Sequence, residues 1–289
     1  MLVSMKQILL DAKEKHYAVP AFDVSNYEMM RAVLETCEEE RSPAILMGLS
    51  VDLADRGMEL LHGMAKAASD CFDIPVCMHF DHATDIEMIK KACDLGFSSV
   101  MFDGSVLPFA ENAEKTAQVV EYAHARGISV EAELGHVGNG AIGGLGETGT
   151  DTDPGESLTV PSEVTEFVNI TDVDALAVAI GTAHGVYQKT PELRIDRLDE
   201  IVAVCDRPLV LHGGSGTPRD QMENAIRHDI TKINIYHDMV AAMNRGIKAK
   251  TDRLENITTW PIFVFEDAKR QMKEVIREKI RTFGSNGRI

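Results

Sequence analysis

Cysteine is scarce in this sequence, and no two cysteines stand in a paired motif. The 289 residues include five cysteines, none of them spaced as Cys-x-x-Cys, and the number is odd. This pattern argues against a disulfide framework and against a zinc site built from cysteines. A reducing, cytoplasmic location fits it best.

Long apolar runs and an excess of positive charge are also missing. No uninterrupted apolar run approaches the roughly 20 residues of a membrane-spanning helix. The N-terminus lacks the apolar core and cleavage site of a signal peptide. The formal net charge is −17, which argues against binding nucleic acid or an anionic membrane through bulk electrostatics. A local anion site made from backbone amides stays open.

The sequence does contain a regular alternation of short apolar runs and amphipathic segments. The apolar runs are continuous, as in parallel strands that are buried on both faces. The segments between them have apolar residues three and four apart, as in helices that cover a sheet. We expect strands at 17–22, 43–47, 75–80, 98–102, 128–134, 174–180, 209–212 and 230–235.

This rhythm predicts an α/β protein with a (β/α)8 barrel, formed by a single domain over residues 1–289. The length is close to the roughly 250 residues typical of that fold, and two extra helices are expected near the C-terminus. An open, doubly wound sheet is the alternative, but no Gly-x-Gly-x-x-Gly motif opens the first βα unit. The rhythm breaks at 135–159, a segment rich in glycine, threonine and acidic residues, which we interpret as a lid or a disordered loop.

Three of the expected strands lead into a histidine near their C-terminal ends, where barrels of this type have their active sites. These histidines are His82, His184 and His212. The C-terminal ends of the strands surround one open end of the barrel, its mouth. Three imidazoles at this mouth suit Zn²⁺ and leave a fourth position for water or substrate. Asp81 either orients a histidine or acts as a general base beside the metal.

Other polar residues near strand ends allow more than one interpretation. Asp103 and Glu133 could hold a second metal, accept hydrogen bonds from the ligands, or form a polar rim. Lys232 shares a strand face with Asn234. It could be a Schiff-base lysine, although a phosphate partner or a buried ion pair is favoured. Structural or surface roles are expected for His16, His62, His79, His124 and His228.

Two glycine-rich segments could contact a ligand. The run His212-Gly213-Gly214-Ser215-Gly216 precedes an expected helix, at the common phosphate site of such barrels. The alternative is a tight connection. A second run, 143–146, precedes Glu147, which could be a mobile acid on a closing lid; a disordered loop is the alternative.

At these motifs the sequence resembles the class II, zinc-dependent ketose-bisphosphate aldolases, which include the fructose- and tagatose-bisphosphate aldolases. The resemblance implies zinc ligands at His82, His184 and His212, and a base at Asp81. It implies a second or buried metal site at Asp103 and Glu133. The resembling segments run in order along the chain, at 17–22, 80–82, 99–105, 130–135, 177–185, 209–216 and 232–234.

The same resemblance implies a reaction and its ligands. A ketose phosphate would be cleaved reversibly into dihydroxyacetone phosphate and an aldehyde, through an enediolate. A monovalent cation, Na⁺ or K⁺, is implied near the phosphate, and a homodimer or homotetramer is the expected assembly. Ser50 corresponds to a contact with the aldehyde half. Contacts with the dihydroxyacetone phosphate half correspond to Gly185, Gly213, Gly214, Ser215 and Asn234.

The departures from the family pattern fall on parts that contact substrate. Asp23 stands where asparagine is usual, and His237 stands where threonine is usual, beside an unusual Tyr236. The loop 138–144 lacks the usual acidic stretch, and 260–263 replaces an Asp-Pro-Arg motif. We therefore expect His237 near the substrate, a retained aldol mechanism and a changed substrate, with the second phosphate missing or replaced.

Three other functions remain as alternatives to a zinc-dependent aldolase. A lysine-based aldolase would use Lys232 and would need no metal. A zinc-dependent hydrolase would use the same barrel and the same ligands with water as the second reactant. A non-catalytic barrel would bind a sugar phosphate without converting it.

Overall fold

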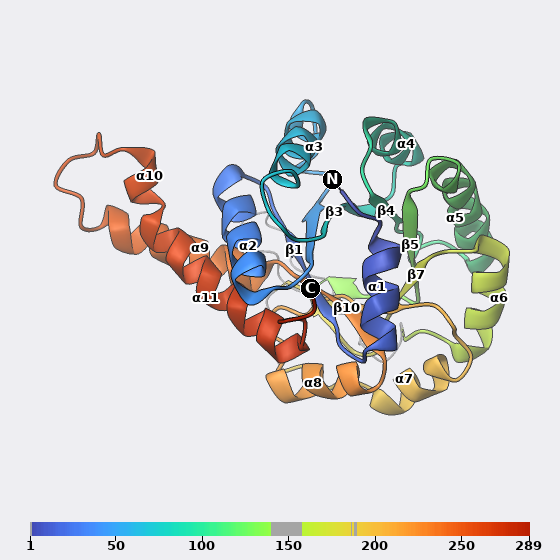
Figure 1. Ribbon diagram of the computed structural model, residues 1–289. Helices are drawn as coiled ribbons and strands as arrows, with labels where there is room; N and C mark the ends of the chain where they lie inside the picture. Colours follow the sequence, from blue (N-terminus) through green and yellow to red (C-terminus); the bar gives the residue numbers. More distant parts are fainter. Residues whose placement is uncertain (1, 140–157, 186, 188–189) are drawn as a thin grey trace.

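The centre of the molecule is a closed barrel of eight parallel strands, which confirms the predicted (β/α)8 fold (Figure 1). The computed structural model describes residues 2–139, 158–185, 187 and 190–289. Neighbouring strands around the barrel follow the order β1-β10-β9-β7-β5-β4-β3-β2. Their bounds are β1 (Val19–Asp23), β2 (Ala44–Gly48), β3 (Val76–Ala83), β4 (Ser99–Phe102), β5 (Ser129–Leu134), β7 (Ala175–Val178), β9 (Leu209–Leu211) and β10 (Ile230–Ile235).

A ring of helices surrounds the strands, and one helix lies across an end of the barrel. In α1 (Met5–Glu14), the apolar residues are buried together with the barrel interior, so this helix closes the end where the strands begin. The side chain of Asn26 accepts a hydrogen bond from the Met29 amide and begins α2, a favoured N-cap. The ring comprises α2 (Tyr27–Glu40), α3 (Gly57–Ala68), α4 (Ile86–Leu95), α5 (Phe109–His124), α6 (Pro161–Thr171), α7 (Ile195–Val202) and α8 (Arg219–Arg227).

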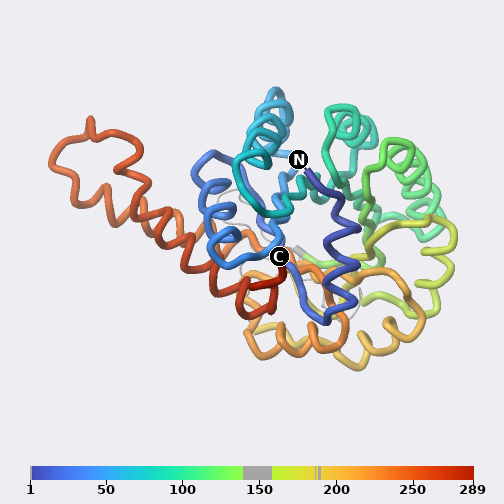
Figure 2. The backbone as a smooth tube through the Cα atoms, viewed as in Figure 1, coloured from blue at the N-terminus to red at the C-terminus, as the bar shows by residue number. Residues whose placement is uncertain are grey.

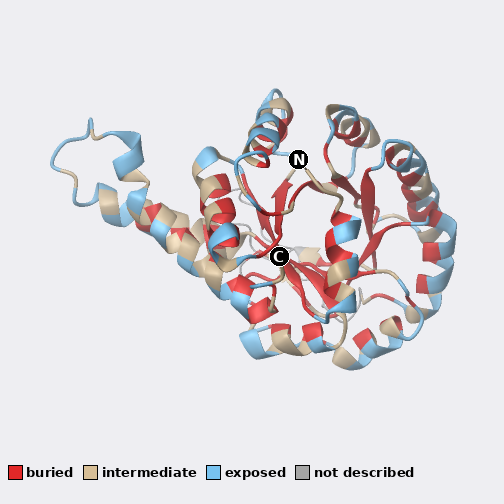
Figure 3. Cartoon of the chain, in the orientation of Figure 1, coloured by how far each residue is buried: buried red, intermediate tan, exposed pale blue. Residues whose placement is uncertain are grey.

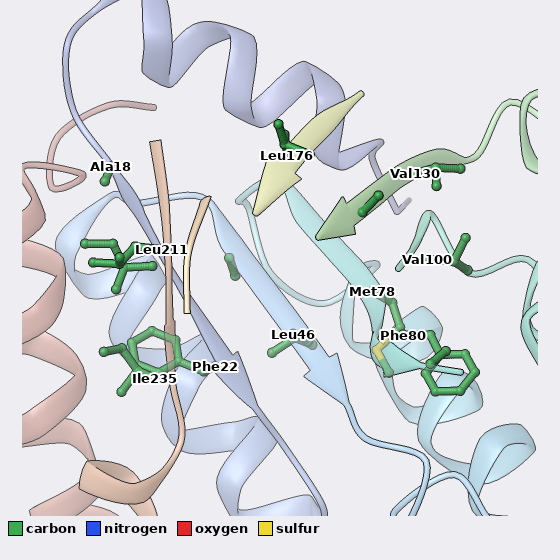
Figure 4. Packing of buried hydrophobic residues seen from close by; sticks show 14 of the residues in the cluster. Ala18, Phe22, Leu46, Met78, Phe80, Val100, Val130, Leu176, Leu211 and Ile235 are labelled. Carbon is green, nitrogen blue, oxygen red and sulfur yellow. The ribbon is translucent and has the colours of Figure 1, made fainter. Parts of the chain in front are cut away.

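The core has two layers because side chains alternate along each strand. One set, which includes Phe22 and Phe80, packs between the strands and the surrounding helices (Figure 4). The other set fills the interior of the barrel near α1. Its strand residues are Val19, Ala21, Ile45, Met47, Cys77, Ala175, Ala177 and Val210.

A short parallel pair that was not predicted lies outside the barrel sheet. It joins β6 (Gly138–Asn139) to β8 (Ala183–His184). The two strands come from the connections that follow β5 and β7, so His184 sits on this pair and not directly on a barrel strand. Much of the expected 135–159 loop, including Glu147, lies outside the described residues.

The last helices form an arm that projects away from the barrel, and the base of the arm packs on the barrel wall, where Ile276, Ile280 and Phe283 are buried in the core (Figures 1 and 2). It consists of α9 (His237–Thr251), α10 (Pro261–Val264) and α11 (Glu266–Phe283), of which the short α10 was not predicted. The tip is exposed (Figure 3), and four of its large apolar residues are accessible to solvent: Ile257, Trp260, Ile262 and Phe263. Of the helices that the structure describes, none is long and apolar enough to cross a membrane.

Candidate active site

Inside the barrel, the apolar layer gives way to polar side chains toward the C-terminal ends of the strands. Strand β3 shows the change most clearly. Cys77 belongs to the interior apolar cluster, and His79 and Asp81 follow on the same face at two-residue spacing. Two other strands place polar residues on their inner faces in the same way, namely Glu131 and Glu133 on β5 and Lys232 and Asn234 on β10.

A bulge near the end of β3 explains how Asp81 and His82, which are adjacent in sequence, both reach the site. Phe80 pairs with Val100 and Ala83 pairs with Phe102, so two residues of β3 oppose one residue of β4. His82 has a φ of 48°, a left-handed conformation that is uncommon for a residue other than glycine. Bulges of this kind bend a strand and redirect a side chain beside active sites. Here the bulge turns the His82 ring toward the mouth.

The three predicted histidines converge at the mouth. The ring centroid of His82 lies 4.6 Å from that of His184 and 4.5 Å from that of His212. A ligand nitrogen from each ring lies within 4.8 Å of the other two. The Nε2 atom of His184 is buried and has no hydrogen-bond partner among the described residues.

The protonation of His184 suits metal binding. Burial lowers its pKa well below the ordinary value, and the positive charges of His82 and His212 lower it further. A neutral imidazole with a free nitrogen is the form that binds metals. His184 is therefore prepared to donate a lone pair toward the centre of the cluster.

Asp103 holds the ring of His82. Its carboxylate lies 2.9 Å from Nδ1 of His82 and accepts hydrogen bonds from the hydroxyl and the amide of Ser105, at 2.7 and 3.1 Å. Burial would raise the pKa of Asp103, but the hydrogen bonds from His82 and Ser105 hold it well below its usual range. A carboxylate in this position fixes the ring and leaves Nε2 of His82 free to bind a metal.

His212 is held by carboxylates on both sides. Its Nδ1 lies 3.0 Å from Glu133, and its Nε2 lies 3.0 Å from Glu131. Burial would lower the pKa of His212, but the hydrogen bonds to Glu131 and Glu133 raise it to about 10. Binding of a metal at His212 therefore requires one nitrogen to give up its proton and its carboxylate partner. His82, Asp103 and Glu133 form a second possible group of ligands.

Glu131 is a central residue that sequence reasoning did not single out. It accepts a hydrogen bond from Nζ of Lys232 at 2.8 Å, and both side chains are fully buried. This pair confirms the buried ion pair that was favoured for Lys232. Burial would raise the pKa of Glu131, but Lys232 and the hydrogen bond from His212 lower it to about 2. Two glutamates at alternate positions of one strand are the signal that could have revealed it.

Asp81 is a buried carboxylate in its charged form. Asn234 donates to both of its oxygens, at 3.3 and 3.0 Å, and Nε2 of His79 lies 3.5 Å away. Burial would raise the pKa of Asp81, but His82 and His79 hold it well below its usual range. The other nitrogen of His79 contacts Ser99 at 2.8 Å, and Nε2 makes no hydrogen bond among the described residues, so the carboxylate is held by Asn234. A charged carboxylate beside three imidazoles is equipped to accept a proton.

The glycines after β9 are required by close packing. A Cβ on Gly213 would lie 2.4 Å from the carbonyl oxygen of Ala183, and one on Gly214 would lie 2.4 Å from Ile233. The Tyr187 hydroxyl donates to the Gly213 carbonyl at 2.7 Å and accepts from the Ala183 amide at 3.1 Å. The tight-connection interpretation therefore explains these glycines on its own, and their contact with a phosphate stays a prediction.

The remaining predicted contacts lie farther along the rim. The Ser215 hydroxyl accepts from the amides of Tyr236 and Asp238, at 3.1 and 3.3 Å, where α9 begins. Its hydroxyl is thus engaged, and its backbone amide is the part suited to a ligand. His237 is half-buried against the ring of Tyr236, and Ser50 is exposed in the turn after β2. Gly185 follows β8 with a φ of 92°.

Comparison with known proteins agrees with this geometry. Residues 3–288 match a family described as class-II fructose-bisphosphate aldolase. The YdjI aldolase of Escherichia coli K12 is 32% identical to this chain, with 99% of each chain covered and a TM-score of 0.85. A fructose-bisphosphate aldolase of Campylobacter jejuni is 21% identical, with 100% of this chain and 97% of that chain covered and a TM-score of 0.82, and supports the fold. The chain therefore belongs to the class-II fructose-bisphosphate aldolase family and is an aldolase, a carbon–carbon lyase.

Proposed function

We propose that the protein is a zinc-dependent aldolase that reversibly cleaves a ketose phosphate into dihydroxyacetone phosphate and an aldehyde. The reaction passes through an enediolate, and Asp81 is the base. One observation carries this proposal: a buried, charged Asp81 carboxylate stands beside three converging imidazoles. Proton removal next to a ketone needs such a base together with stabilisation of the resulting negative charge.

The residues at the mouth fit a metal ion. His82, His184 and His212 would hold Zn²⁺ with an open fourth position, as catalytic zinc sites do. The unpartnered nitrogen of His184 is a direct sign of fit, because a buried polar atom normally has a partner. A bound Zn²⁺ would act as a Lewis acid for the ketone and hydroxyl oxygens of the substrate. Asp103 and Glu133 would orient these ligands or hold a second ion.

The chain's own residues move and position the proton. Asp81 takes it from the carbon next to the ketone in the direction of synthesis and returns it after cleavage. Asn234 keeps the Asp81 carboxylate in place through its two hydrogen bonds, and His79 Nε2 lies 3.5 Å from the same group. Lys232 is committed to Glu131 at 2.8 Å, which argues against a Schiff base at this lysine.

The two ends of the substrate would lie on opposite sides of the mouth. Backbone amides of Gly185, Gly213 and Ser215 would bind the phosphate of dihydroxyacetone phosphate, with a Na⁺ or K⁺ ion nearby. Gly214 would line the same site, while its amide donates to the Asn234 carbonyl at 3.2 Å. Asn234 would contact the same half. Ser50 and His237, on the turn after β2 and the start of α9, would face the aldehyde half.

A retro-aldol assay over a panel of ketose mono- and bisphosphates tests the proposal. We expect cleavage that EDTA abolishes and Zn²⁺ restores, and no adduct at Lys232 after borohydride treatment. A trapped adduct with chelator-resistant activity would support a lysine mechanism. Turnover with water and without an aldehyde product would support a hydrolase, and binding without turnover would support a non-catalytic role. Efficient cleavage of fructose 1,6-bisphosphate alone would contradict a changed substrate.

We also propose that the protein is a cytoplasmic homodimer or homotetramer that assembles through its arm. All five cysteines are free in the structure, as suits a reducing compartment. The arm tip exposes Trp260 and Ile257, at 74% and 95% of their surface. Exposed apolar residues that cluster in this way mark interaction surfaces.

A further inference from the structure

Asp23 is a buried carboxylate that points into the barrel mouth and lacks a partner for one oxygen. Val19 and Ala21 of β1 face the barrel interior, so Asp23, two residues further on, faces the same side. Only 4% of its surface is exposed. Its Oδ1 atom has no hydrogen-bond partner among the residues that the structure describes. A buried acceptor of this kind needs a donor from elsewhere.

Asp52 supplies a second acceptor of the same kind close by. It lies in the turn after β2, the strand that neighbours β1, and its Oδ2 atom is buried and unpartnered within the described part of the chain. Phe22 pairs with Ile235 and Asp23 pairs with Met47, so Asp23 lies beside Tyr236 and beside the strand that leads into the turn with Asp52. The two carboxylates and the Tyr236 phenol therefore share one region of the mouth.

The buried lysine near this region is already committed. Lys232 stands on β10, the strand that pairs with β1, and its Nζ lies 2.8 Å from Glu131. A phosphate or a carboxylate placed here would therefore meet two acidic side chains, while the lysine is held by another carboxylate. A hydroxyl group would instead supply the hydrogen-bond donors that both carboxylates lack.

The position of the two aspartates corresponds to the aldehyde end of the substrate. Going around the barrel, the strand order is β9, β10, β1, β2 and β3. The glycine-rich loop follows β9, and Asp81 stands on β3. Asp23 and the turn that contains Asp52 therefore lie beyond β10 from the glycine-rich loop, on the side of the base.

We propose that Asp23 and Asp52 determine specificity by binding hydroxyl groups of an uncharged, polyhydroxylated aldehyde and by disfavouring a phosphorylated or carboxylated one. This inference rests on the proposed aldol function and names its aldehyde class. Asp23 offers its unpartnered Oδ1 atom as an acceptor at this point. Tyr236 adds a neutral hydroxyl that can also contact the polyol.

The test compares two aldehydes that differ by one phosphate group. The kcat/KM for aldol addition of dihydroxyacetone phosphate is measured with glyceraldehyde and with glyceraldehyde 3-phosphate, using the zinc-loaded enzyme. We expect the wild type to favour glyceraldehyde by at least about tenfold, because a phosphate at this position would lose water without gaining a free cation. Asp52→Asn and Asp23→Asn should each shift this ratio toward the phosphorylated aldehyde. Asp55→Asn, an exposed aspartate in the same turn, is the matched control and should leave the ratio unchanged.

A second measurement separates this inference from the proposed function. Exchange of the α-proton of dihydroxyacetone phosphate in D₂O, without any aldehyde, reports the enediolate step alone. Exchange together with a preference for glyceraldehyde 3-phosphate would overturn the specificity inference and leave the proposed function standing. An equal shift of the ratio in Asp55→Asn would also overturn it, since general surface charge would then be the cause. Absence of exchange in the wild type would overturn both.

Discussion

At the scale of single residues, the site depends on a chain of buried charges. Lys232 is paired with Glu131, which also holds His212, and His212 in turn contacts Glu133. A buried charge is tolerated only when it is paired and hydrogen-bonded. These side chains therefore fix the orientation of His212, one of the proposed metal ligands.

Loss of one partner from this chain should be costly. Lys232→Met leaves Glu131 charged and buried without its cation, and we expect a loss of about 3–5 kcal/mol in the free energy of unfolding. Urea denaturation measures this value. The double variant Lys232→Met/Glu131→Gln removes both charges and should recover part of the loss. A single-variant effect below about 1 kcal/mol would show that the pair is not buried as described.

The same pair gives stability a defined pH dependence. The pKa of Glu131 in the folded protein is about 2, against an ordinary value of 4.5, because Lys232 and His212 outweigh its burial. A depressed pKa means that Glu131 contributes stability above pH 4.5 and loses that contribution as the pH falls toward 2. The free energy of unfolding of the metal-free protein, measured with urea, should fall as the pH is lowered through this window. The fall should be less steep in Glu131→Gln than in the wild type. Identical slopes in the two proteins would contradict the assignment.

The sequence predicted the residues that stand at or near strand ends. His82, His184, His212 and Asp81 could be found there, because the ends of parallel strands meet at one mouth. Glu131 was missed because it lies mid-strand, where its partner Lys232 is 101 residues away in sequence. The use of the Ser215 hydroxyl to hold the start of α9 also depends on tertiary contacts.

At the scale of elements, the bulge in β3 is the feature that assembles the site. A regular strand would point Asp81 and His82 to opposite faces. The shifted register between Phe80 and Ala83, together with the left-handed His82, brings both to the mouth. A sequence pattern shows alternation but not a bulge. The position of both residues at a strand end predicted that they lie at the site, whereas the alternation of side chains alone would have separated them.

A variant at this bulge can separate metal binding from folding. Asparagine tolerates the left-handed conformation, so His82→Asn should fold normally while losing an imidazole ligand. We expect its zinc affinity to fall by at least about tenfold, as measured by competition with a chelator. His124→Asn, a histidine paired with Asp174 away from the mouth, is the control and should bind zinc as the wild type does. Unchanged affinity in His82→Asn would exclude His82 as a ligand.

The long, periodic elements were predictable, and the short ones were not. The barrel strands can be recognised in the sequence as continuous apolar runs. The pair β6–β8 has two residues in each strand, and it depends on a tertiary contact in which Gly138 pairs with Ala183 and Asn139 pairs with His184. The four-residue helix α10 depends on Pro261 at its start. Neither has enough residues to show a period.

At the scale of the whole molecule, the arm differs from the rest of the chain in its net charge and in the exposed apolar residues at its tip. Residues 237–283 carry ten lysines or arginines and seven aspartates or glutamates, so the arm is net positive in a chain of net charge −17. Its apolar tip extends away from the barrel (Figure 3). Much of this positive charge is paired within the chain, because Lys273, Arg277 and Arg281 of α11 form ion pairs with glutamates of α2. The proposed assembly therefore depends on the exposed apolar tip and not on the charge of the arm.

Substitutions at the tip test the proposed assembly. Trp260→Glu combined with Phe263→Glu adds charge to the exposed apolar residues, so we expect dissociation toward monomers with little loss of fold stability. Sedimentation velocity over a range of protein concentrations measures the change. Val204→Glu, on an exposed apolar residue of the barrel (42% exposed), is the control and should leave the assembly intact. An unchanged oligomer in the double variant would exclude the tip as the interface.

The central claim is that Asp81 removes a proton from a substrate held at the His82, His184 and His212 cluster. The most direct test is α-proton exchange of dihydroxyacetone phosphate in D₂O, followed by NMR with zinc-loaded protein and no aldehyde. We predict exchange in the wild type and a loss of about 10²–10⁴-fold in Asp81→Asn, with the zinc content of the two proteins equal. Exchange at the wild-type rate in zinc-loaded Asp81→Asn would contradict the account.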